Sequence, residues 1–330
     1  MRQKTGYIGT YDSPDSPGIF RFTIDLDTGH LSDPKLYCRV PDCKYLSLYN
    51  GLLAAPVRRD GRCGISLSDT TAAGVPAPAE VFCEESPACF VTQDANLVYT
   101  ANYHEGSVRI YEKSGGTPRL LKHIEIAPKA GCHQVILHGR YMLIPCLLLN
   151  RVNIYDRDQD FALVGSLEFP PGTGPRHGTI DNDFRLFLVS ELSNELFVYD
   201  WQNGPLPTLR AQLPVLPAGF TSAKPPASAA IRLSPDERFL YVSTRFADVI
   251  TVFELENSTN GTLPRAVQQL GSGGVHPRDI VLTPGGEFLL AANRTDGSLV
   301  SFRRDPGSGQ LSDPISRVPA PEAVSVALEP

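Results

Sequence analysis

The sequence predicts an all-β fold, a seven-bladed β-propeller with four-stranded antiparallel blades, and three observations lead to it. The 330 residues include 28 glycines and 29 prolines, a density of chain-breaking residues that leaves no room for a bundle of long helices. Two short apolar patterns each recur seven times, at intervals of 44 to 54 residues. Several short strands within a repeat of this length are typical of a propeller blade.

The repeated patterns assign the strands of each unit. The first pattern, a short apolar strand opened by a polar pair, predicts the innermost strand of each blade at residues 43–48, 87–92, 131–136, 175–180, 228–233, 277–282 and 321–326. The second, a longer β-rich run, predicts the next strand at 5–11, 51–57, 97–103, 141–147, 185–191, 239–245 and 288–294. Third strands alternate apolar and polar residues at 18–24, 107–113, 151–157, 195–201, 249–255 and 298–304.

The order of the units predicts how the ring closes. Residues 5–37 supply only the second to fourth strands of a unit, whereas the last innermost strand stands alone at 321–326. We therefore expect the C-terminal strand to complete the N-terminal blade and to leave no free sheet edge. The Pro-rich stretch 214–229 is predicted to be an insertion between two blades. Residues 1–330 are expected to form one domain, because two unrelated β-sandwiches would not explain seven matching spacings.

Composition narrows the class of protein. The net charge of -6, with acidic and basic residues interspersed, argues against binding to nucleic acid or to an acidic membrane surface. No apolar run is long enough for a transmembrane helix, and the N-terminus lacks the apolar stretch of a signal peptide. The seven cysteines include no C-x-x-C pair, so we expect reduced thiols in a cytoplasmic protein. A closed propeller needs no partner for stability, so we expect either a monomer or a homodimer.

The repeat also predicts where a functional site lies. Innermost and next strands run antiparallel, so the start of one and the end of the other meet at the same mouth of the channel. The innermost strands bring to this mouth Lys44, Ala88, Cys132, Arg176, Ala229, Arg278 and Glu322, flanked by His133, His177 and His276. The ends of the next strands bring Tyr11, Val57, Tyr103, Leu147, Glu191, Arg245 and Arg294. The loop after Tyr103 is expected to form an exposed tip at His104 and Glu105.

Four arginines, a glutamate and up to three histidines therefore converge on one mouth. Arginine binds carboxylate or phosphate through paired N–H donors, and glutamate or histidine can move protons near neutral pH. This set favours a small anionic substrate that undergoes hydrolysis or proton transfer. Metal catalysis is less favoured, because guanidinium groups repel a cation and no His/Asp cluster has ligand spacing. No Gly-rich phosphate loop links a strand to a helix, so no cofactor is predicted.

Particular motifs carry a resemblance to a known family. They lie at 7–11 (YIGTY), 101–112, 172–178 (GTGPRHG), 189–200, 233–245 and 274–294. Over essentially its whole length, the chain resembles the lactonase family of seven-bladed propellers. That family includes propeller-type 6-phosphogluconolactonase and carboxy-cis,cis-muconate cyclase. The G-T-G-P-R-H motif is the most specific part of the resemblance.

The resemblance implies a catalytic site of one histidine, two arginines and a glutamate. The matching positions are His133, Arg176, Glu191 and Arg245. Thr244 replaces the asparagine that precedes the last arginine in the family. In the implied hydrolysis Glu191 or His133 acts as general base on a water, and the two arginines stabilise the oxyanion. The residues expected to bind the substrate are His177, Arg278, Arg294 and Tyr103.

The chain departs from the family pattern in three places. They are Val57, Cys43-Lys44 and Cys146-Leu147-Leu148, and they make one side of the mouth more apolar and less acidic. The substrate is therefore left open, including whether it is 6-phosphogluconolactone. Three functions remain: a lactonase, a muconate-type lactonising cycloisomerase that uses the same site, and a non-catalytic propeller that binds a partner. The single tryptophan and the lack of G-H and W-D punctuation weigh against the last.

Overall fold

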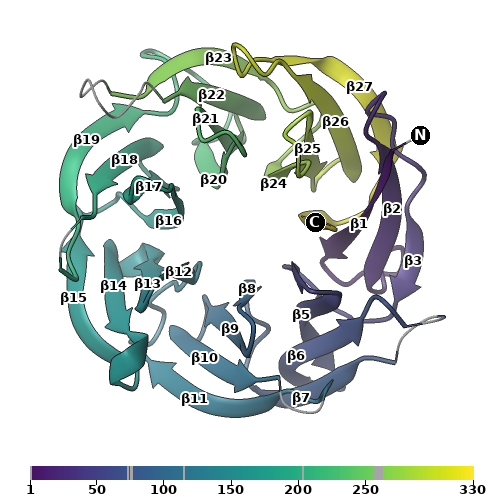
Figure 1. Ribbon diagram of the computed structural model, residues 1–330, viewed down its shortest axis with the longest axis vertical. Coiled ribbons are helices and arrows are strands. Elements are labelled where there is room, and N and C mark those ends of the chain that lie inside the picture. The colour runs from purple at the N-terminus through teal and green to yellow at the C-terminus, as the bar shows by residue number, and fades with distance from the viewer. Residues whose placement is uncertain (1, 73, 75–76, 114–115, 203, 256–262) are drawn as a thin grey trace.

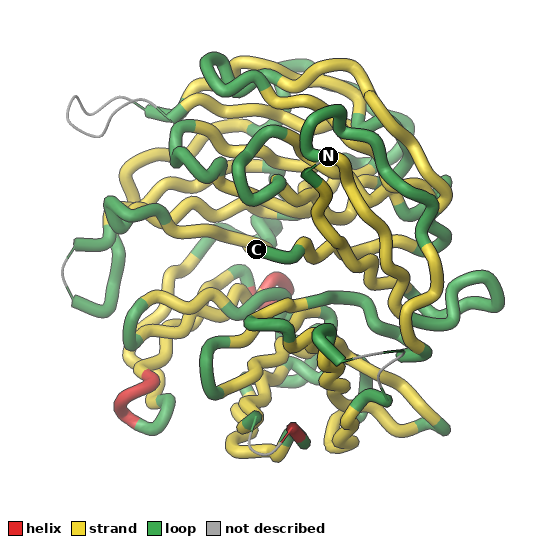
Figure 2. Tube along the Cα trace, turned by 45° about the vertical axis from the view of Figure 1, so that its right-hand side comes forward, coloured by secondary structure: helices red, strands yellow, loops and turns green. Residues whose placement is uncertain are grey.

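The strands of the protein form seven four-stranded antiparallel sheets, arranged as blades around a central axis (Figure 1). The computed structural model describes residues 2–72, 74, 77–113, 116–202, 204–255 and 263–330. The predicted seven-bladed β-propeller is confirmed. In the turned view of Figure 2 strands dominate, and helix is limited to short segments such as the 3-10 turns η2 (Leu147–Leu149) and η3 (Arg157–Gln159). No helix in the described residues is long and apolar enough to cross a bilayer.

The blades are numbered from the one that holds both termini, and their strands are given from the innermost outward. Blade 1 consists of β28 (Ala323–Leu328), β1 (Gln3–Thr10), β2 (Ile19–Asp25) and β3 (Lys35–Cys38). Blade 2 consists of β4 (Ser47–Tyr49), β5 (Leu52–Arg59), β6 (Arg62–Asp69) and β7 (Ala79–Glu84). Blade 3 consists of β8 (Phe90–Gln93), β9 (Leu97–Asn102), β10 (Ser107–Glu112) and β11 (Arg119–Glu125).

The remaining four blades follow the same order. Blade 4 consists of β12 (Ile136–His138), β13 (Tyr141–Cys146), β14 (Arg151–Asp156) and β15 (Ala162–Glu168). Blade 5 consists of β16 (Pro175–Ile180), β17 (Arg185–Ser190), β18 (Glu195–Asp200) and β19 (Thr208–Pro214). Blade 6 consists of β20 (Ala227–Leu233), β21 (Phe239–Arg245), β22 (Val249–Glu254) and β23 (Arg265–Gly271). Blade 7 consists of β24 (Pro277–Leu282), β25 (Phe288–Asn293), β26 (Ser298–Arg304) and β27 (Leu311–Pro319).

The two ends of the chain close the ring within blade 1. Strand β28 pairs antiparallel with β1, with Tyr7 opposite Ala327 and Ile8 opposite Val326. The predicted closure by the C-terminal strand is confirmed, and β1 gains the partner that it would otherwise lack. The Pro-rich insertion forms the connection between β19 and β20, as predicted.

Some strand boundaries differ from the prediction. The innermost strands of blades 2, 3 and 4 begin at Ser47, Phe90 and Ile136, later than residues 43, 87 and 131. Backbone turns with positive φ at Asp42 and Gly131 precede two of these strands, so the polar pairs lie in irregular segments. The third strand of blade 2, β6, was missed because its small residues obscure the alternation.

The core lies between neighbouring blades. Each inner sheet packs on both of its faces, so all seven residues of β21 are buried and the strand reads as a continuous apolar run. Phe187 of β17 and Leu240 of β21 belong to one such layer, and Tyr241 and Leu289 belong to the next. A register shift in the pairing of the two outer strands recurs in every blade. Such bulges increase the twist of the sheet.

Candidate functional site

The start of each innermost strand and the end of its neighbour lie at the same face of the ring, as their antiparallel pairing requires. In blade 5, Arg176 is the second residue of β16 and Glu191 directly follows β17. The backbone N–H of Glu191 donates to the carbonyl of Gly174 at 2.8 Å, which ties the two strand ends together. In blade 6, Arg245 ends β21 and lies opposite Ala227. We call the face around Arg176, Glu191 and Arg245 the mouth.

A glutamate between two arginines occupies the mouth, and we call these three side chains the clamp. Arg176 Nε donates to Glu191 Oε2 at 2.8 Å, and Arg245 Nη2 lies 2.7 Å from the same oxygen. The second contact is an ion pair without hydrogen-bond geometry, so Arg245 Nη2 has no hydrogen-bond partner in the described chain. The backbone carbonyls of Ala229 and Ala227 in β20 accept hydrogen bonds from Arg176 Nη1 and Arg245 Nε, which anchors both guanidinium groups.

The clamp leaves one oxygen of Glu191 available. Both arginines contact Oε2, and no described residue donates a hydrogen bond to Oε1. The Glu191 side chain is 19% exposed, against 2% for Arg176 and 7% for Arg245. Burial raises the pKa of Glu191, but the charges of Arg176 and Arg245 outweigh it and hold the pKa below its ordinary value. Burial and the charge of Arg176 lower the pKa of Arg245 to about 10, which leaves it charged at neutral pH.

Two buried imidazoles contact each other near the clamp. His133 Nδ1 and His177 Nε2 are 3.2 Å apart, so one ring donates and the other accepts. Burial and the charge of Arg176 lower the pKa of both rings well below 6.5, so both are neutral at pH 7. His177 Nδ1 is buried without a partner among the described residues. A buried unpaired N–H is rarer than an under-satisfied acceptor, so we assign the shared proton to His177 Nε2 and the proton of His133 to its own Nε2.

Aromatic rings hold the two histidines in place. The ring of Tyr103 lies edge-to-face with His133 at 5.8 Å, and Phe90 lies edge-to-face with His177 at 5.6 Å. His177 is 2% exposed and His133 is 6% exposed. Burial, followed by the charge of Glu191, raises the pKa of Tyr103, so its hydroxyl stays protonated at neutral pH. His177 therefore supports His133, and Tyr103 offers a neutral hydrogen-bonding group.

A second group of cations surrounds Tyr11, and we call its three members the cationic cluster. The guanidinium carbon of Arg294 lies 4.3 Å from the centre of the Tyr11 ring, and that of Arg278 lies 5.6 Å from it. Lys44 Nζ lies 5.5 Å from the same centre. Arg294 also forms an ion pair with Glu322 at 3.0 Å. Residues from blades 7, 1 and 2 therefore gather positive charge here.

A small pocket joins the cationic cluster to the clamp. It is lined by Lys44, Tyr45, Cys89, His133, Arg176, His177, Arg278 and Val324. A larger hollow of about 670 Å³ lies in blade 7 around Gly286, Arg304 and Leu311. Its buried arginine, Arg304, already donates to Tyr241 and Asp236. The mouth pocket is the better candidate site, because Arg245 Nη2 and Glu191 Oε1 beside it have no hydrogen-bond partner among the described residues.

The structure brings a further ion pair to this pocket that sequence reasoning missed. Arg232 Nη2 donates to Asp279 Oδ1 at 2.6 Å and to the Tyr45 hydroxyl at 3.1 Å. Asp279 is buried and also accepts the backbone N–H of Val326 at 3.1 Å. Asp279 and Tyr45 directly follow Arg278 and Lys44 in the sequence. Extending the innermost-strand pattern by one residue would have found both of them.

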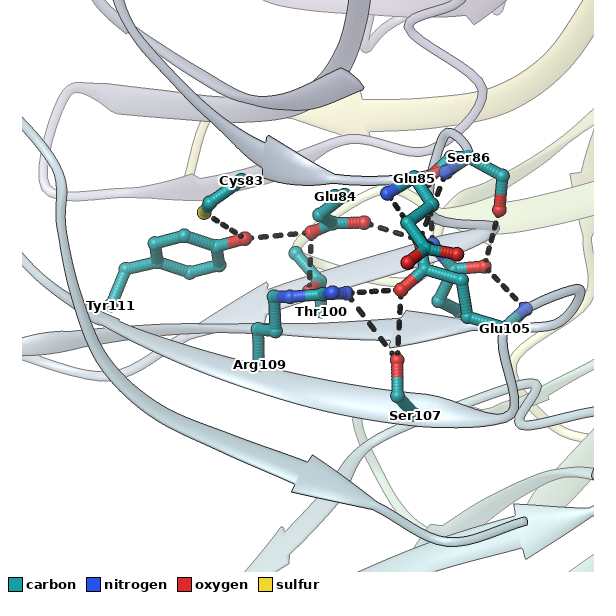
Figure 3. Close-up of polar contacts among 10 residues, drawn as sticks. Cys83, Glu84, Glu85, Ser86, Thr100, Glu105, Ser107, Arg109 and Tyr111 are labelled. Atoms are coloured by element: carbon teal, nitrogen blue, oxygen red, sulfur yellow. Dashed lines mark hydrogen bonds and ion pairs between the residues drawn. The ribbon is translucent and has the colours of Figure 1, made fainter. Parts of the chain in front are cut away.

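A buried polar network lies next to the mouth in blades 2 and 3 (Figure 3). Glu84 accepts hydrogen bonds from the Tyr111 hydroxyl at 2.8 Å, the Thr100 hydroxyl at 2.9 Å and Asn102 Nδ2 at 3.0 Å. Burial raises the pKa of Glu84. Asn102 directly precedes Tyr103, so the network fixes the backbone that carries Tyr103 into the mouth.

Glu105 is the second carboxylate of this network. It accepts the backbone N–H groups of Glu85 and Ser86 at 2.8 Å and 2.9 Å, and pairs with Arg109 (Figure 3). The prediction of an exposed tip is wrong for Glu105, whose side chain is 9% exposed, although His104 is exposed. The polar sequence of this loop predicts exposure to solvent, but the loop turns back so that Glu105 pairs with the buried Arg109 at the start of the following strand, β10.

The charges of the mouth point to an anionic ligand. The described part of the chain contains no group of three or more His, Cys, Asp or Glu side chains placed to bind a metal ion. The predicted catalytic residues His133, Arg176, Glu191 and Arg245 lie together with Tyr103 around the clamp. Arg278 reaches the same pocket, and Arg294 lies in the cationic cluster beyond it. His276 lies at the same side of the ring: its carbonyl accepts the backbone N–H of Arg294 at 3.1 Å, and burial and the charge of Arg245 lower its pKa to about 4.

Comparisons with known proteins agree with this fold. The family model for "Lactonase, 7-bladed beta-propeller" matches residues 5–328. A 6-phosphogluconolactonase of Bacillus subtilis is 29% identical over 347 residues, which cover 99% of this chain and 98% of that protein. A Lactobacillus plantarum protein of known structure superposes over 100% of both chains, with a TM-score of 0.92 and 26% identity.

One more solved structure shares the fold. The periplasmic gluconolactonase of Pseudomonas aeruginosa superposes with a TM-score of 0.90 at 23% identity, over 100% of this chain and 99% of that chain. The family model accounts for nearly every residue that the strands and the mouth are built from. This chain therefore belongs to the lactonase family of seven-bladed β-propellers.

Proposed function

We propose that this protein is a lactonase that hydrolyses a small anionic lactone at the mouth. The observation that carries the proposal is the clamp, in which Oε1 of Glu191 has no hydrogen-bond partner in the described part of the chain while two buried arginines lie beside it. Hydrolysis of a lactone needs a group that activates water and positive charge where the carbonyl oxygen becomes negative. The name of the Bacillus subtilis relative adds support for a sugar-acid lactone, with 6-phosphogluconolactone as the specific candidate.

The first step of the proposed mechanism takes place at Glu191. Oε1 binds a water and accepts its proton while the water oxygen attacks the acyl carbon of the lactone. The lowered pKa keeps Glu191 ionised at neutral pH, so the base is present in its active form. The bond between the acyl carbon and the ring oxygen then breaks, and Glu191 returns the proton to that oxygen. The products are a hydroxyl group and a carboxylic acid, which releases its proton to the solvent to become a carboxylate, and Glu191 is regenerated.

The arginines and His133 act on the oxygen of the carbonyl group. Arg245 Nη2 carries N–H groups without a hydrogen-bond partner in the described chain, and Arg176 adds a second positive charge. A single oxyanion donor in a preorganised site contributes about 2.7–4 kcal/mol of transition-state stabilisation. His133, neutral and protonated on Nε2 in our assignment, serves as a hydrogen-bond donor. These roles leave Glu191 as the base.

The second candidate function is a lactonising cycloisomerase of the muconate type, which one observation favours. Leu148 and Leu192 are 46% and 50% exposed, and Leu192 directly follows Glu191. A Cβ atom on Gly174 would lie 2.7 Å from Leu192 Cγ, so Leu192 packs closely against the backbone of the mouth. An unsaturated acid with few hydroxyl groups would bury part of its surface against these leucines. The same clamp would then bind its carboxylates.

A substrate panel tests the proposal on the full chain. Ring opening is measured as acid release at pH 7 on a phosphorylated, a carboxylated and an uncharged lactone, and ring closure is measured on a carboxymuconate. We expect the anionic lactones to open well above their spontaneous rates. Ring closure without any ring opening would establish the cycloisomerase instead. No turnover in either direction would contradict both enzymatic functions and leave the partner-binding propeller.

A further inference from the structure

The mouth holds more positive charge than its carboxylates neutralise. Glu191 pairs with Arg176 and Arg245, and Glu322 pairs with Arg294. Two cations of the same region are left over, Lys44 and Arg278. Within the described residues no carboxylate lies within 4.0 Å of either one. The contact of Lys44 Nζ with the carbonyl of Pro87 is long, at 3.5 Å.

The two unpaired cations are held close to a third. Lys44, Arg278 and Arg294 all face the ring of Tyr11, at 5.5 Å, 5.6 Å and 4.3 Å. The negative face of an aromatic ring attracts each cation, but it leaves the repulsion among the three in place. A chain with a net charge of -6 thus maintains a local concentration of positive charge. An anion bound among these groups would remove the repulsion.

The cationic cluster is connected to the clamp and distinct from it. Lys44 and Arg278 line the same pocket as Arg176 and His133. The charge of Arg278 also contributes to the lowered pKa of Glu191, which shows that it acts on the clamp electrostatically. The pocket itself is about 10 Å³, room for about one water, so a ligand that reaches both groups would lie across the mouth outside it, with the clamp on one side and the cationic cluster on the other.

We propose that Lys44, Arg278 and Arg294 form a second anion subsite, which binds a phosphate monoester of the substrate while the clamp binds its lactone. This inference rests on the proposed lactonase function. A phosphate monoester offers three terminal oxygens and a charge of about -1.5 to -2 at pH 7. It therefore matches three cations better than a carboxylate with two oxygens and one charge. Because Glu322 already neutralises part of Arg294, Lys44 and Arg278 determine the specificity.

The kinetic test compares a phosphorylated hexonolactone with the same lactone without phosphate. The variants are Lys44→Met, Arg278→Met and the double variant, which remove charge and keep an apolar stem. Each charge-assisted contact is worth about a 10- to 100-fold change in binding. We expect KM for the phosphorylated lactone to rise by that factor in each single variant, and the loss of kcat/KM to be at least about tenfold larger on the phosphorylated lactone than on the uncharged one. Lys35→Met, an exposed cation on the outer strand β3, is the matched control.

Equal losses on both lactones in the double variant would overturn the subsite, as would a wild-type protein that does not distinguish the two lactones. Calorimetric binding of a phosphorylated sugar acid separates this inference from the proposed function, because it needs no turnover. Binding by the wild type that is lost in the double variant supports the subsite even if no lactone is hydrolysed. Turnover of lactones by a protein whose phosphate binding survives both substitutions supports the lactonase and contradicts the subsite.

Discussion

Glu191→Gln tests the clamp most sharply of any single substitution. The amide keeps the size of the side chain and one oxygen, but it removes the charge and the group that accepts the proton of water. Arg176 and Arg245, which are 2% and 7% exposed, would then face each other without a counter-charge. Both catalysis and stability should respond, by amounts that the structure allows us to separate.

The two effects of Glu191→Gln differ in size. Loss of a positioned general base costs about 10²- to 10⁴-fold in rate, so we expect kcat to fall about 1,000-fold. Breaking a buried ion pair costs about 3–5 kcal/mol of unfolding free energy, and partial exposure with a remaining oxygen for Arg176 reduces this to about 2–3 kcal/mol. The chain should therefore stay folded while it loses activity.

The assay measures kcat by acid release and the unfolding free energy by urea denaturation at pH 7. Glu80→Gln is the matched control, since Glu80 pairs with Arg59 at 2.8 Å, is 13% exposed and lies on the outer strand β7. It should lose stability and keep its kcat within about twofold, because it touches no substrate. A folded Glu191→Gln protein with more than a tenth of the wild-type kcat would refute the reasoning and transfer the role of base to His133.

Four further predictions concern Arg176 of the clamp, the pH dependence of stability, the buried network around Glu84, and the closure of the propeller by its C-terminal strand. Arg176→Ala should lower kcat/KM about 100-fold or more through the loss of oxyanion stabilisation, and an unchanged value would remove Arg176 from the reaction. The unfolding free energy should decline as the pH falls below 6.5, since His133 and His177 have lowered folded-state pKa values and take up protons on unfolding; urea titrations at pH 7, 6 and 5 check this, and a flat profile would contradict it. Glu84→Gln should cost about 1–3 kcal/mol, measured by thermal unfolding, because three donors face its carboxylate; an unchanged midpoint would show that they do not depend on its charge. Deletion of residues 322–330 should expose the edge of β1 and cause aggregation, which size-exclusion chromatography detects; a folded monomer would show that closure is dispensable.

Most of the fold was predictable because every blade of a propeller repeats the same short sequence patterns. Each blade carries the same apolar strands at nearly the same interval, so errors in one blade are corrected by the others. The errors lie where a blade departs from the repeat. Small residues such as Gly64 obscure the alternation of apolar and polar residues in β6. Turns at Asp42 and Gly131 make the innermost strands of blades 2 and 4 begin later than the pattern predicts.

The sequence predicts which residues meet at the mouth, but not which of their atoms contact one another. The register of the strands places Arg176, Glu191 and Arg245 at one mouth, because antiparallel pairing fixes which strand ends meet. That both arginines contact the same oxygen depends on side-chain conformations and on the rotation between blades 5 and 6, which no sequence pattern encodes. The pairing of Glu105 with Arg109, four residues later in the same blade, was missed because it depends on both side-chain conformations.

A crystal structure of the protein with a phosphorylated sugar acid, the product of the proposed reaction, would show directly which groups of the mouth bind each end of the ligand. The account predicts the carboxylate of the ligand within about 3 Å of the arginine donors of the clamp, next to Glu191 Oε1. It predicts the phosphate between Lys44 and Arg278. A ligand bound outside the mouth, or with its phosphate at the clamp and its carboxylate at the cationic cluster, would contradict it.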